Sequence, residues 1–288
     1  MQTLNLIIPM AGAGKRFISQ NYKTYKTLLN VDNKATVYDK ILSNFKLKKT
    51  KIVVILNKEI FSKFKNKFDK KNVKVIFIDR HDNGPLYTLY KAKNELSKII
   101  KKKESLFVCY GDINWKWDFK KVLINLKSTD ACVFTHNGFH PHLEVNSNSD
   151  FCKVKKNLIK KVLQKKKFSK DYKKDYLAIG CYYFKKYEYL NNYLNQKKLY
   201  SKKNEYYLLS FVNYLINNKY KVRKYDINKF VHLGTPEQYE DFKSWKKELS
   251  QKKTSNILNI NRNNLCVMLM AGQGKRLKSL DKNKFLIP

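Results

Sequence analysis

No apolar run in this sequence approaches the ~20 residues that a helix needs to cross a bilayer, and the chain does not begin with a basic segment followed by an apolar one. We therefore expect a cytoplasmic protein without membrane insertion. Cysteines are few and far apart, with no Cys-x-x-Cys pair among Cys109, Cys132, Cys152, Cys181 and Cys266. Several stand in strand-like runs, where a thiol behaves as a small buried hydrophobe, so neither disulfides nor a zinc site is expected.

Acidic residues are scarce as well: 23 Asp and Glu stand against 61 Lys and Arg, which gives a formal net charge of +38. Such a charge raises the hypothesis of a nucleic-acid-binding protein. The excess is almost all lysine and is spread along the chain, whereas a binding patch would cluster arginine with aromatic residues on one element. We interpret it as a solvated lysine surface that attracts any polyanion, nucleotides included, with no specific nucleic-acid partner.

Apolar runs of strand length alternate with longer segments of helical periodicity, which is typical of βαβ units around a sheet. This pattern predicts a Rossmann-like three-layer α/β fold with a mixed, mainly parallel central sheet. The expected strands are 4–10, 52–56, 73–78, 106–109 and 131–135. The expected helices between them are 36–45, 58–68, 85–99 and 119–126.

After about residue 136 the rhythm changes, and the predicted elements form a smaller β-rich lobe over the sheet. Antiparallel strands are expected at 151–155, 158–163 and 176–184, followed by helices 204–217 and 235–249 that flank a strand pair around 222–231. Thr235 and Pro236 are a good start for the last helix, with Thr as the cap and Pro at the first helical position.

The end of the sequence repeats its beginning. MAGAGKRF at 10–17 recurs as MAGQGKRL at 270–277, each after an apolar strand. We therefore divide the chain into a domain at 1–250, a polar linker at 251–264 and the start of a second unit at 265–288. We expect a truncated tandem protein in which Gly272, Lys275 and Arg276 make no working site; the alternative is that the tail adds an edge strand to the first domain.

The strongest functional pattern is a strand that runs directly into PMAGAGKRF, residues 9–17. Two glycines remove side-chain obstruction, so that successive N–H groups can point at an anion, and Lys15 and Arg16 add charge-assisted bonds. We expect a phosphate-binding loop formed by Ala11, Gly12, Ala13, Gly14, Lys15 and Arg16. The spacing fits neither a Walker A loop nor a dinucleotide-binding motif, and a glycine turn between strand and helix is the alternative.

A second candidate, Asp112, follows the buried-looking strand LFVCYGD. That position places a carboxylate at the edge of the sheet where open α/β folds bind ligands. Mg²⁺ prefers carboxylate and phosphate oxygens, so Asp112 is a candidate metal ligand. Its alternative role is to cap the next turn.

These motifs together resemble the sugar-phosphate nucleotidyltransferases, whose N-terminal signature is G-x-G-x-R followed after about ten residues by Pro-Lys. The resemblance covers residues 1 to about 250 and rests on GAGKRF, the segment 22–31, HDNGPLYTL at 81–89, YGD at 110–112, GFHPH at 138–142, GCYYF at 180–184, NEYY at 204–207 and LGTPE at 233–237. The form with FHPH resembles a subgroup associated with bacterial surface-polysaccharide pathways.

The resemblance implies roles for individual residues on the nucleotide side. Arg16 matches the arginine that engages the β,γ-phosphates, and Lys26 matches a lysine near the α-phosphate and the incoming phosphate, although Tyr25 replaces its usual preceding proline. Asp112 matches the Mg²⁺ aspartate. Gly84 matches a glycine that lies against the nucleobase, with a plain turn before a helix as the alternative.

On the acceptor side Lys165 matches the lysine of a Glu-Lys pair, with Gln164 in place of the glutamate, and Gly180 matches a glycine that approaches the sugar ring. His140 and His142 could touch substrate or be structural.

The second metal aspartate of many relatives would stand at His232. Histidine is a poor Mg²⁺ ligand, so either Asp112 with substrate oxygens and water completes the shell, or Asp226 substitutes, or the site is catalytically weak.

The expected function is transfer of a nucleotidyl group from an NTP (UTP, CTP or dTTP) to a sugar 1-phosphate, with Mg²⁺ as cofactor and pyrophosphate as the second product. One alternative is a cytidylyltransferase that acts on a non-sugar phosphate. Others are a non-catalytic regulatory nucleotide-binding domain and a protein that only binds nucleic acid. Association into a homo-oligomer is left open.

Overall fold

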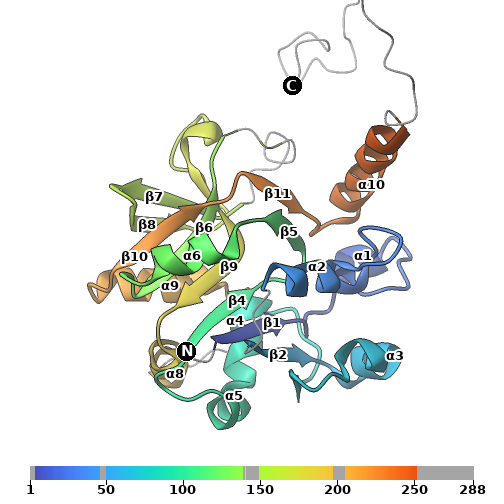
Figure 1. The fold of residues 1–288 in the computed structure, drawn as a ribbon, viewed down its shortest axis with the longest axis horizontal. Helices are drawn as coiled ribbons and strands as arrows, with labels where there is room; N and C mark the ends of the chain where they lie inside the picture. The colour runs from blue at the N-terminus through green and yellow to red at the C-terminus, as the bar shows by residue number, and fades with distance from the viewer. Residues whose placement is uncertain (1–3, 46–49, 139, 141–148, 197–204, 252–288) are drawn as a thin grey trace, which may run out of the picture. The chain divides into compact units, whose positions relative to one another are not determined.

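The computed structural model describes residues 4–45, 50–138, 140, 149–196 and 205–251 (Figure 1). Met1–Phe242 form a compact unit, and of Lys243–Pro288 the structure describes only the end of the last helix. The second copy of the glycine motif, the predicted linker from residue 252 on, Cys266 and His142 therefore lie outside the described residues. Within the described part, none of the helices has the length and apolar character to cross a membrane.

The strands and helices follow the predicted alternation. The strands are β1 (Leu4–Pro9), β2 (Thr50–Leu56), β3 (Val73–Phe77), β4 (Ser105–Cys109), β5 (Ile113–Lys116), β6 (Ala131–His136), β7 (Phe151–Lys155), β8 (Leu158–Leu163), β9 (Tyr176–Phe184), β10 (Val222–Asp226) and β11 (Lys229–His232). The α-helices are α1 (Lys15–Ile18), α2 (Val37–Asn44), α3 (Lys58–Phe68), α4 (Gly84–Lys91), α5 (Lys93–Ile99), α6 (Phe119–Leu126), α8 (Tyr187–Gln196), α9 (Leu208–Asn217) and α10 (Pro236–Gln251), with 3₁₀ turns at Lys26–Leu28 and Tyr172–Lys174.

In the described part of the chain, nine strands form one mixed sheet in the order β3-β2-β1-β4-β9-β6-β10-β8-β7. The strands β3, β2, β1 and β4 are parallel, and β9 runs antiparallel to both β4 and β6. The carboxyl ends of β1, β3 and β4 therefore meet at one edge of the sheet, where the segments that follow them can share a ligand. This confirms the predicted fold class, and it places residues 10–16, 78–84 and 110–112 next to one another.

The β-rich part differs from expectation in its connections. Strands β7, β8 and β9 form as predicted, but they continue the main sheet, because β9 pairs with β4 and β6 along its length and with β7 at its first residues. The expected strand pair near 222–231 consists of two strands that do not pair with each other. Strand β10 joins β6 and β8, and β11 pairs with β5, a strand the sequence did not predict.

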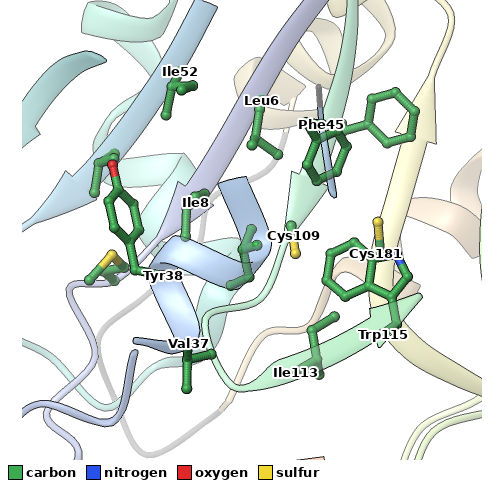
Figure 2. Packing of buried hydrophobic residues seen from close by; sticks show 14 of the residues in the cluster. Leu6, Ile8, Val37, Tyr38, Phe45, Ile52, Cys109, Ile113, Trp115 and Cys181 are labelled. Carbon is green, nitrogen blue, oxygen red and sulfur yellow. The ribbon is translucent and has the colours of Figure 1, made fainter. Parts of the chain in front are cut away.

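Two apolar layers cover the sheet, as alternate side chains of β1 show. Leu6 and Ile8 face the core that contains α2, α3 and α6, whereas Ile7 faces the core that contains α4, α5, α8 and α9. Figure 2 shows Val37 and Tyr38 of α2 beside β1 in the first layer. All these β1 side chains are completely buried. Burying a side chain of this size contributes about 1.5–3 kcal/mol, so these layers hold the sheet edge in place.

Helix boundaries follow from local capping. Thr36 and Asp39 make a reciprocal capping box at the start of α2, and Asn57 and Asp118 cap α3 and α6 with their side chains. The predicted helix 85–99 is two helices, because Ala92 takes φ −89° and ψ 0°, outside the helical range. The described cysteines are buried and free, as predicted.

Candidate functional site

The loop between β1 and α1 is held in place through its own backbone. The N–H of Met10 donates to the carbonyl of Ile55 at 2.7 Å, and the N–H of Ala13 donates to the carbonyl of His81 at 2.9 Å. Gly12 forms an isolated parallel bridge with His81, whose N–H donates to Ala11 at 3.4 Å. The segment after β3 thus extends the sheet by one pairing onto the predicted phosphate loop.

Two side chains hold the next carbonyl groups of this loop. The hydroxyl of Tyr25 donates to the carbonyl of Gly12 at 3.1 Å, and the guanidinium of Arg80 donates to the carbonyl of Ala13 at 2.5 Å. Gly14 has φ 67°, a conformation that glycine adopts without strain. The loop carbonyls are therefore occupied by protein donors.

Most N–H groups of the loop, unlike its carbonyl groups, have no hydrogen-bond partner among the described residues. No hydrogen bond between described residues uses the N–H groups of Gly12, Gly14, Lys15 or Arg16. Successive N–H groups of this kind form a concave anion-binding surface. Lys15 is exposed and pairs with Asp82, and Arg16 is exposed. The arrangement can accept several phosphate oxygens.

Lys26 and Asp112, which the sequence placed in one site, are in contact. The ammonium of Lys26 lies 2.7 Å from Oδ2 of Asp112. Burial alone would raise the pKa of Asp112, but Lys26 and His232 bring that pKa below its usual value, so the carboxyl stays ionised. Its other oxygen, Oδ1, is buried and accepts no hydrogen bond within the described residues. A buried carboxylate oxygen in this state can coordinate a cation.

His232 lies beside Asp112 because β11 pairs with β5. His232 stands opposite Ile113, and the N–H of Leu233 donates to the carbonyl of Asp112 at 2.7 Å. A Cβ atom on Gly234 would lie 3.0 Å from Nε2 of His232 and 3.3 Å from Oδ2 of Asp112. The position of the expected second metal aspartate is thus next to Asp112, and an imidazole occupies it.

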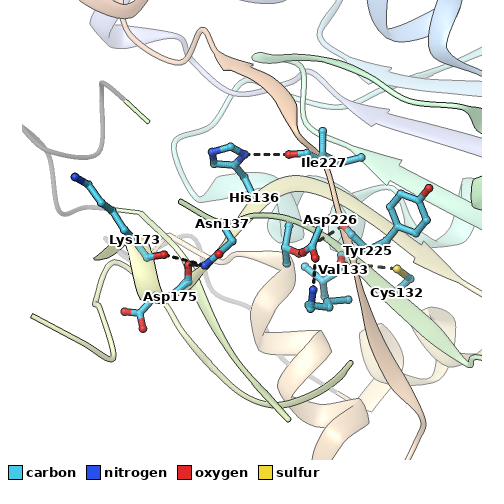
Figure 3. A network of polar contacts seen from close by, with 11 residues as sticks. Cys132, Val133, His136, Asn137, Lys173, Asp175, Tyr225, Asp226 and Ile227 are labelled. Atoms are coloured by element: carbon cyan, nitrogen blue, oxygen red, sulfur yellow. Dashed lines mark hydrogen bonds and ion pairs between the residues drawn. The ribbon is translucent and has the colours of Figure 1, made fainter. Parts of the chain in front are cut away.

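Asp226 does not take over that position. It ends β10, which is three strands away from β4, a separation of about 14 Å at the usual strand spacing. Its carboxylate accepts the hydroxyl of Thr135 at 2.8 Å and pairs with Lys224 (Figure 3). The suggestion that Asp226 substitutes as a metal ligand is therefore wrong. Among the described residues there is no group of three or more His, Cys, Asp or Glu side chains that could hold a metal ion.

On the predicted acceptor side, Lys165 has a carboxylate partner that the sequence did not reveal. Its ammonium lies 2.5 Å from Oε2 of Glu205, which also accepts the hydroxyl of Tyr207. Burial alone would raise the pKa of Glu205, but Lys165, Tyr207 and the charge of Arg16 lower it. Gln164 instead donates to Ser210 at 2.8 Å.

Gly84 and Gly180 are each required by packing within the protein. Gly84 has φ 80°, and a Cβ atom there would lie 2.7 Å from the carbonyl oxygen of Tyr206. Gly180 has φ 90°, and its Cβ atom would lie 2.8 Å from the ring of Tyr110. The turn before α4 therefore explains Gly84 without a ligand, and contact of either glycine with a nucleobase or a sugar stays a prediction.

The histidines of this region pack against an aromatic ring. The ring centre of buried His140 lies 5.2 Å from that of Phe230 and 5.7 Å from that of His136. His136 in turn bonds the carbonyl of Ile227 through Nδ1 at 2.9 Å (Figure 3). These contacts favour the structural role for His140.

A recess of about 360 Å³ lies at the ends of β2 and β3. Its lining includes Lys58, Phe77, Asp79 and Arg80. Because Arg80 also holds the carbonyl of Ala13, the recess and the loop share a wall.

Comparison with known proteins identifies the family of the chain. The model of the nucleotidyl transferase family matches residues 6–248, so the chain belongs to that family. No curated protein matches the sequence.

Three solved structures share the fold at low sequence identity. A nucleoside-diphosphate-sugar pyrophosphorylase from Vibrio cholerae RC9 aligns at TM-score 0.65 and 20% identity, covering 82% of this chain and 98% of its own. A Bacillus anthracis protein described as a glucose-1-phosphate thymidylyltransferase aligns at TM-score 0.66 and 16% identity, covering 85% and 96%. The inositol-1-phosphate CTP transferase from T. maritima aligns at TM-score 0.63 and 15% identity, covering 86% and 97%.

Asp150, beside Lys165, gives the site a pH-dependent stability. Burial raises the pKa of Asp150 to about 6, although the N–H of Lys165 donates to its Oδ1 at 3.1 Å. Because the folded-state pKa is raised, the fold loses stability as the pH rises through 6, when this carboxylate ionises. We predict that Asp150→Asn raises the melting temperature by several degrees at pH 8 and by much less at pH 4.5.

Thermal unfolding at the two pH values tests this, with exposed Asp171→Asn as the control. A gain for Asp150→Asn that is equal at pH 4.5 and pH 8 would contradict the assignment.

Proposed function

We propose that this chain transfers a nucleotidyl group from an NTP to a sugar 1-phosphate, giving an NDP-sugar and pyrophosphate. The observation that carries the proposal is the Lys26–Asp112 pair at the same sheet edge as a loop with four N–H groups that donate to no described residue. In this reaction a phosphate oxygen of the acceptor attacks the α-phosphorus in line, and both reactants are anions. Catalysis then consists mainly of positioning and charge neutralisation, for which no protein nucleophile is needed.

Each residue of the site has a task in that proposal. The N–H groups of the loop and the guanidinium of Arg16 bind the β,γ-phosphates that leave as pyrophosphate. Lys26 neutralises the α-phosphate and the attacking phosphate. The nucleoside end of the NTP extends toward Gly84 and the recess beside Arg80. Lys15 exchanges its acidic partner, Asp82, for phosphate when the NTP binds.

The residues present fit a magnesium ion held by one carboxylate. Oδ1 of Asp112 is buried and accepts no hydrogen bond from the described part of the chain, and Mg²⁺ is commonly bound through one or two carboxylates together with substrate phosphates and water. Asp112 would hold the ion, which would neutralise charge on the reacting phosphates. His232 is a poor ligand for it, and it adds to the larger effect of Lys26 in lowering the pKa of Asp112.

The acceptor end is formed by Lys165, Glu205 and Tyr207. An ammonium suits the acceptor phosphate, and the carboxylate of Glu205 can accept hydrogen bonds from hydroxyl groups of a sugar or other polyol. Lys165 and Glu205 are each about half exposed, so a ligand can reach them. The FHPH run supports a role in surface-polysaccharide synthesis.

One alternative acceptor follows from a specific contact. Gln164 is engaged with Ser210, so the Glu-Lys pattern for a common hexose is not reproduced at 164–165. A cytidylyltransferase acting on a non-sugar phosphate is therefore the second candidate, and one of the similar structures is an inositol-1-phosphate CTP transferase. A non-catalytic nucleotide-binding domain is the third, because of His232.

Pyrophosphate release separates these candidates. The chain is incubated with Mg²⁺ and each of UTP, CTP, dTTP, GTP and ATP, against a panel of sugar 1-phosphates, inositol 1-phosphate and phosphorylated amino alcohols. We expect release with one NTP and a sugar 1-phosphate. Release only with CTP and a non-sugar phosphate supports the second candidate. A thermal shift with NTP but no release with any acceptor supports the third.

We predict that Asp112→Asn abolishes turnover and leaves the fold intact, because it removes the charge that would hold Mg²⁺ but keeps the size of the side chain. The matched control is Asp226→Asn, which changes a carboxylate at the same sheet edge that is bound to Thr135 and Lys224. Rates are measured across a Mg²⁺ titration. An Asp112→Asn enzyme that keeps more than about a tenth of the wild-type rate at saturating Mg²⁺ would refute the metal assignment.

We also predict that Glu205→Gln raises the KM for the acceptor about 10- to 100-fold, because a hydrogen bond to a charged group is worth about 1.5–3 kcal/mol. The KM for the NTP should change little. Gln164→Ala is the control, since its side chain bonds Ser210. If Gln164→Ala has the larger effect on the acceptor KM, the role belongs to Gln164 and not to Glu205.

A further inference from the structure

Tyr25 occupies a backbone position that suits proline. Its φ of −64° and ψ of 138° lie in the range that a pyrrolidine ring imposes, and no hydrogen bond between described residues uses its N–H group. The sequence resembles a family that has proline here. The geometry that proline would fix is thus present in this chain without proline, and a side chain with its own contacts stands in its place.

The side chain of Tyr25 packs against the phosphate loop. Its hydroxyl donates to the carbonyl of Gly12 at 3.1 Å, and a Cβ atom on Gly14 would lie 3.6 Å from Cε2 of the ring. Burial, and then the nearby charge of Asp112, raise the pKa of the Tyr25 phenol, so the hydroxyl stays a donor at neutral pH. Both glycines of the motif are therefore in reach of this one ring.

Arg80 holds the same loop from a different element. Its guanidinium donates to the carbonyl of Ala13, one residue after the carbonyl that Tyr25 holds, and it lies 4.0 Å from the carboxylate of Glu59. Two successive carbonyl groups are thus fixed by donors that come from separate parts of the chain. Because each peptide group is planar, holding the carbonyl of Gly12 also fixes the N–H of Ala13, which donates to His81, and holding the carbonyl of Ala13 fixes the N–H of Gly14.

Tyr25 is also joined directly to the residue that contacts the metal-site carboxylate. Lys26 follows it in the chain and lies 2.7 Å from Oδ2 of Asp112. The dipeptide 25–26 therefore connects the phosphate loop with Asp112 through one hydrogen bond and one ion pair.

We propose that Tyr25 is a positioning residue that sets the phosphate loop relative to Lys26 and Asp112 through its hydroxyl and its ring. The inference rests on the proposed function of the same site. It assigns to a tyrosine side chain the constraint that proline would supply through the backbone alone. It predicts that the hydroxyl matters for triphosphate binding even though it touches no substrate.

Two substitutions separate the side chain from the backbone. Tyr25→Phe removes only the hydroxyl, whereas Tyr25→Pro keeps φ near −65° and removes the ring. The control is Tyr22→Phe, which removes a hydroxyl that donates to Glu240 near the surface. Inorganic tripolyphosphate is the probe because it reports on the loop whatever the base is, and the five NTPs are measured beside it by calorimetry with Mg²⁺.

We expect Tyr25→Phe and Tyr25→Pro each to weaken tripolyphosphate binding at least fivefold at a temperature well below both melting temperatures. Tyr22→Phe should leave it unchanged. In turnover, Tyr25→Phe should raise the KM for the NTP and leave the KM for the acceptor unaltered, a split that a general loss of stability would not produce.

Three results would overturn the inference. Wild-type affinity in Tyr25→Phe would show that the hydroxyl does not position the loop. Wild-type affinity in Tyr25→Pro would show that backbone restriction suffices. Failure of the wild-type chain to bind tripolyphosphate or any NTP would refute the proposed function together with this inference. This result can be told from the first two because the wild-type chain itself then shows no binding.

Discussion

The site depends on one constraint, the anchoring of the backbone between β1 and α1. Backbone hydrogen bonds with His81 fix Ala11 and Ala13. The side chains of Tyr25 and Arg80 hold the carbonyl groups of Gly12 and Ala13. Because each carbonyl is already satisfied, the loop can present N–H groups to an anion without rearranging its own hydrogen bonds. A preorganised dipolar surface of this kind costs little reorganisation when charge arrives, which is the condition for strong electrostatic stabilisation.

The remaining charges are arranged around that loop by the sheet. Strand β4 delivers Asp112 next to the loop, and β9, which is antiparallel to β4, places Gly180 against Tyr110. Gly180 therefore lies on the same sheet as the strand before Asp112, whereas the proposed acceptor residues Lys165 and Glu205 follow β8 and precede α9. In the proposed site, where His232 stands beside Asp112, a metal ion would have one carboxylate from the protein, and substrate phosphates would supply further ligands.

The sequence predicts those parts of the fold and of the candidate site whose structure depends on local sequence alone. The helices at 58–68 and 119–126 match α3 and α6, because each has a polar cap and an amphipathic period, and the glycines around β1 marked the phosphate loop. Lys26 and Asp112 are 86 residues apart, so no local pattern could place them in one site. Only the family resemblance predicted that they belong together. Strand β5 was missed because four residues are too few for a periodic signal, and its pairing with β11 is non-local.

The same reasoning explains the residues that the sequence did not single out as functional. Glu205 meets Lys165 across 40 positions, and Tyr25 meets Gly12 through a side chain whose direction no pattern reveals. The one available signal for Glu205 was the NEYY run at 204–207, and for Tyr25 it was the absence of proline. Asp226 was wrongly predicted for the opposite reason. It is close to His232 in the sequence, which suggested a shared site, but the strand order places β10 three strands from β4.

Amide hydrogen exchange in the phosphate loop tests the central claim most directly. The account predicts that adding Mg²⁺ and the NTP that gives the largest thermal shift protects the N–H groups of Gly12, Gly14, Lys15 and Arg16. The N–H of Ala13, which already donates to His81, should gain only the protection that the whole domain gains. Strong binding of the NTP with no added protection at those four amides would show that the triphosphate lies elsewhere and would contradict the account.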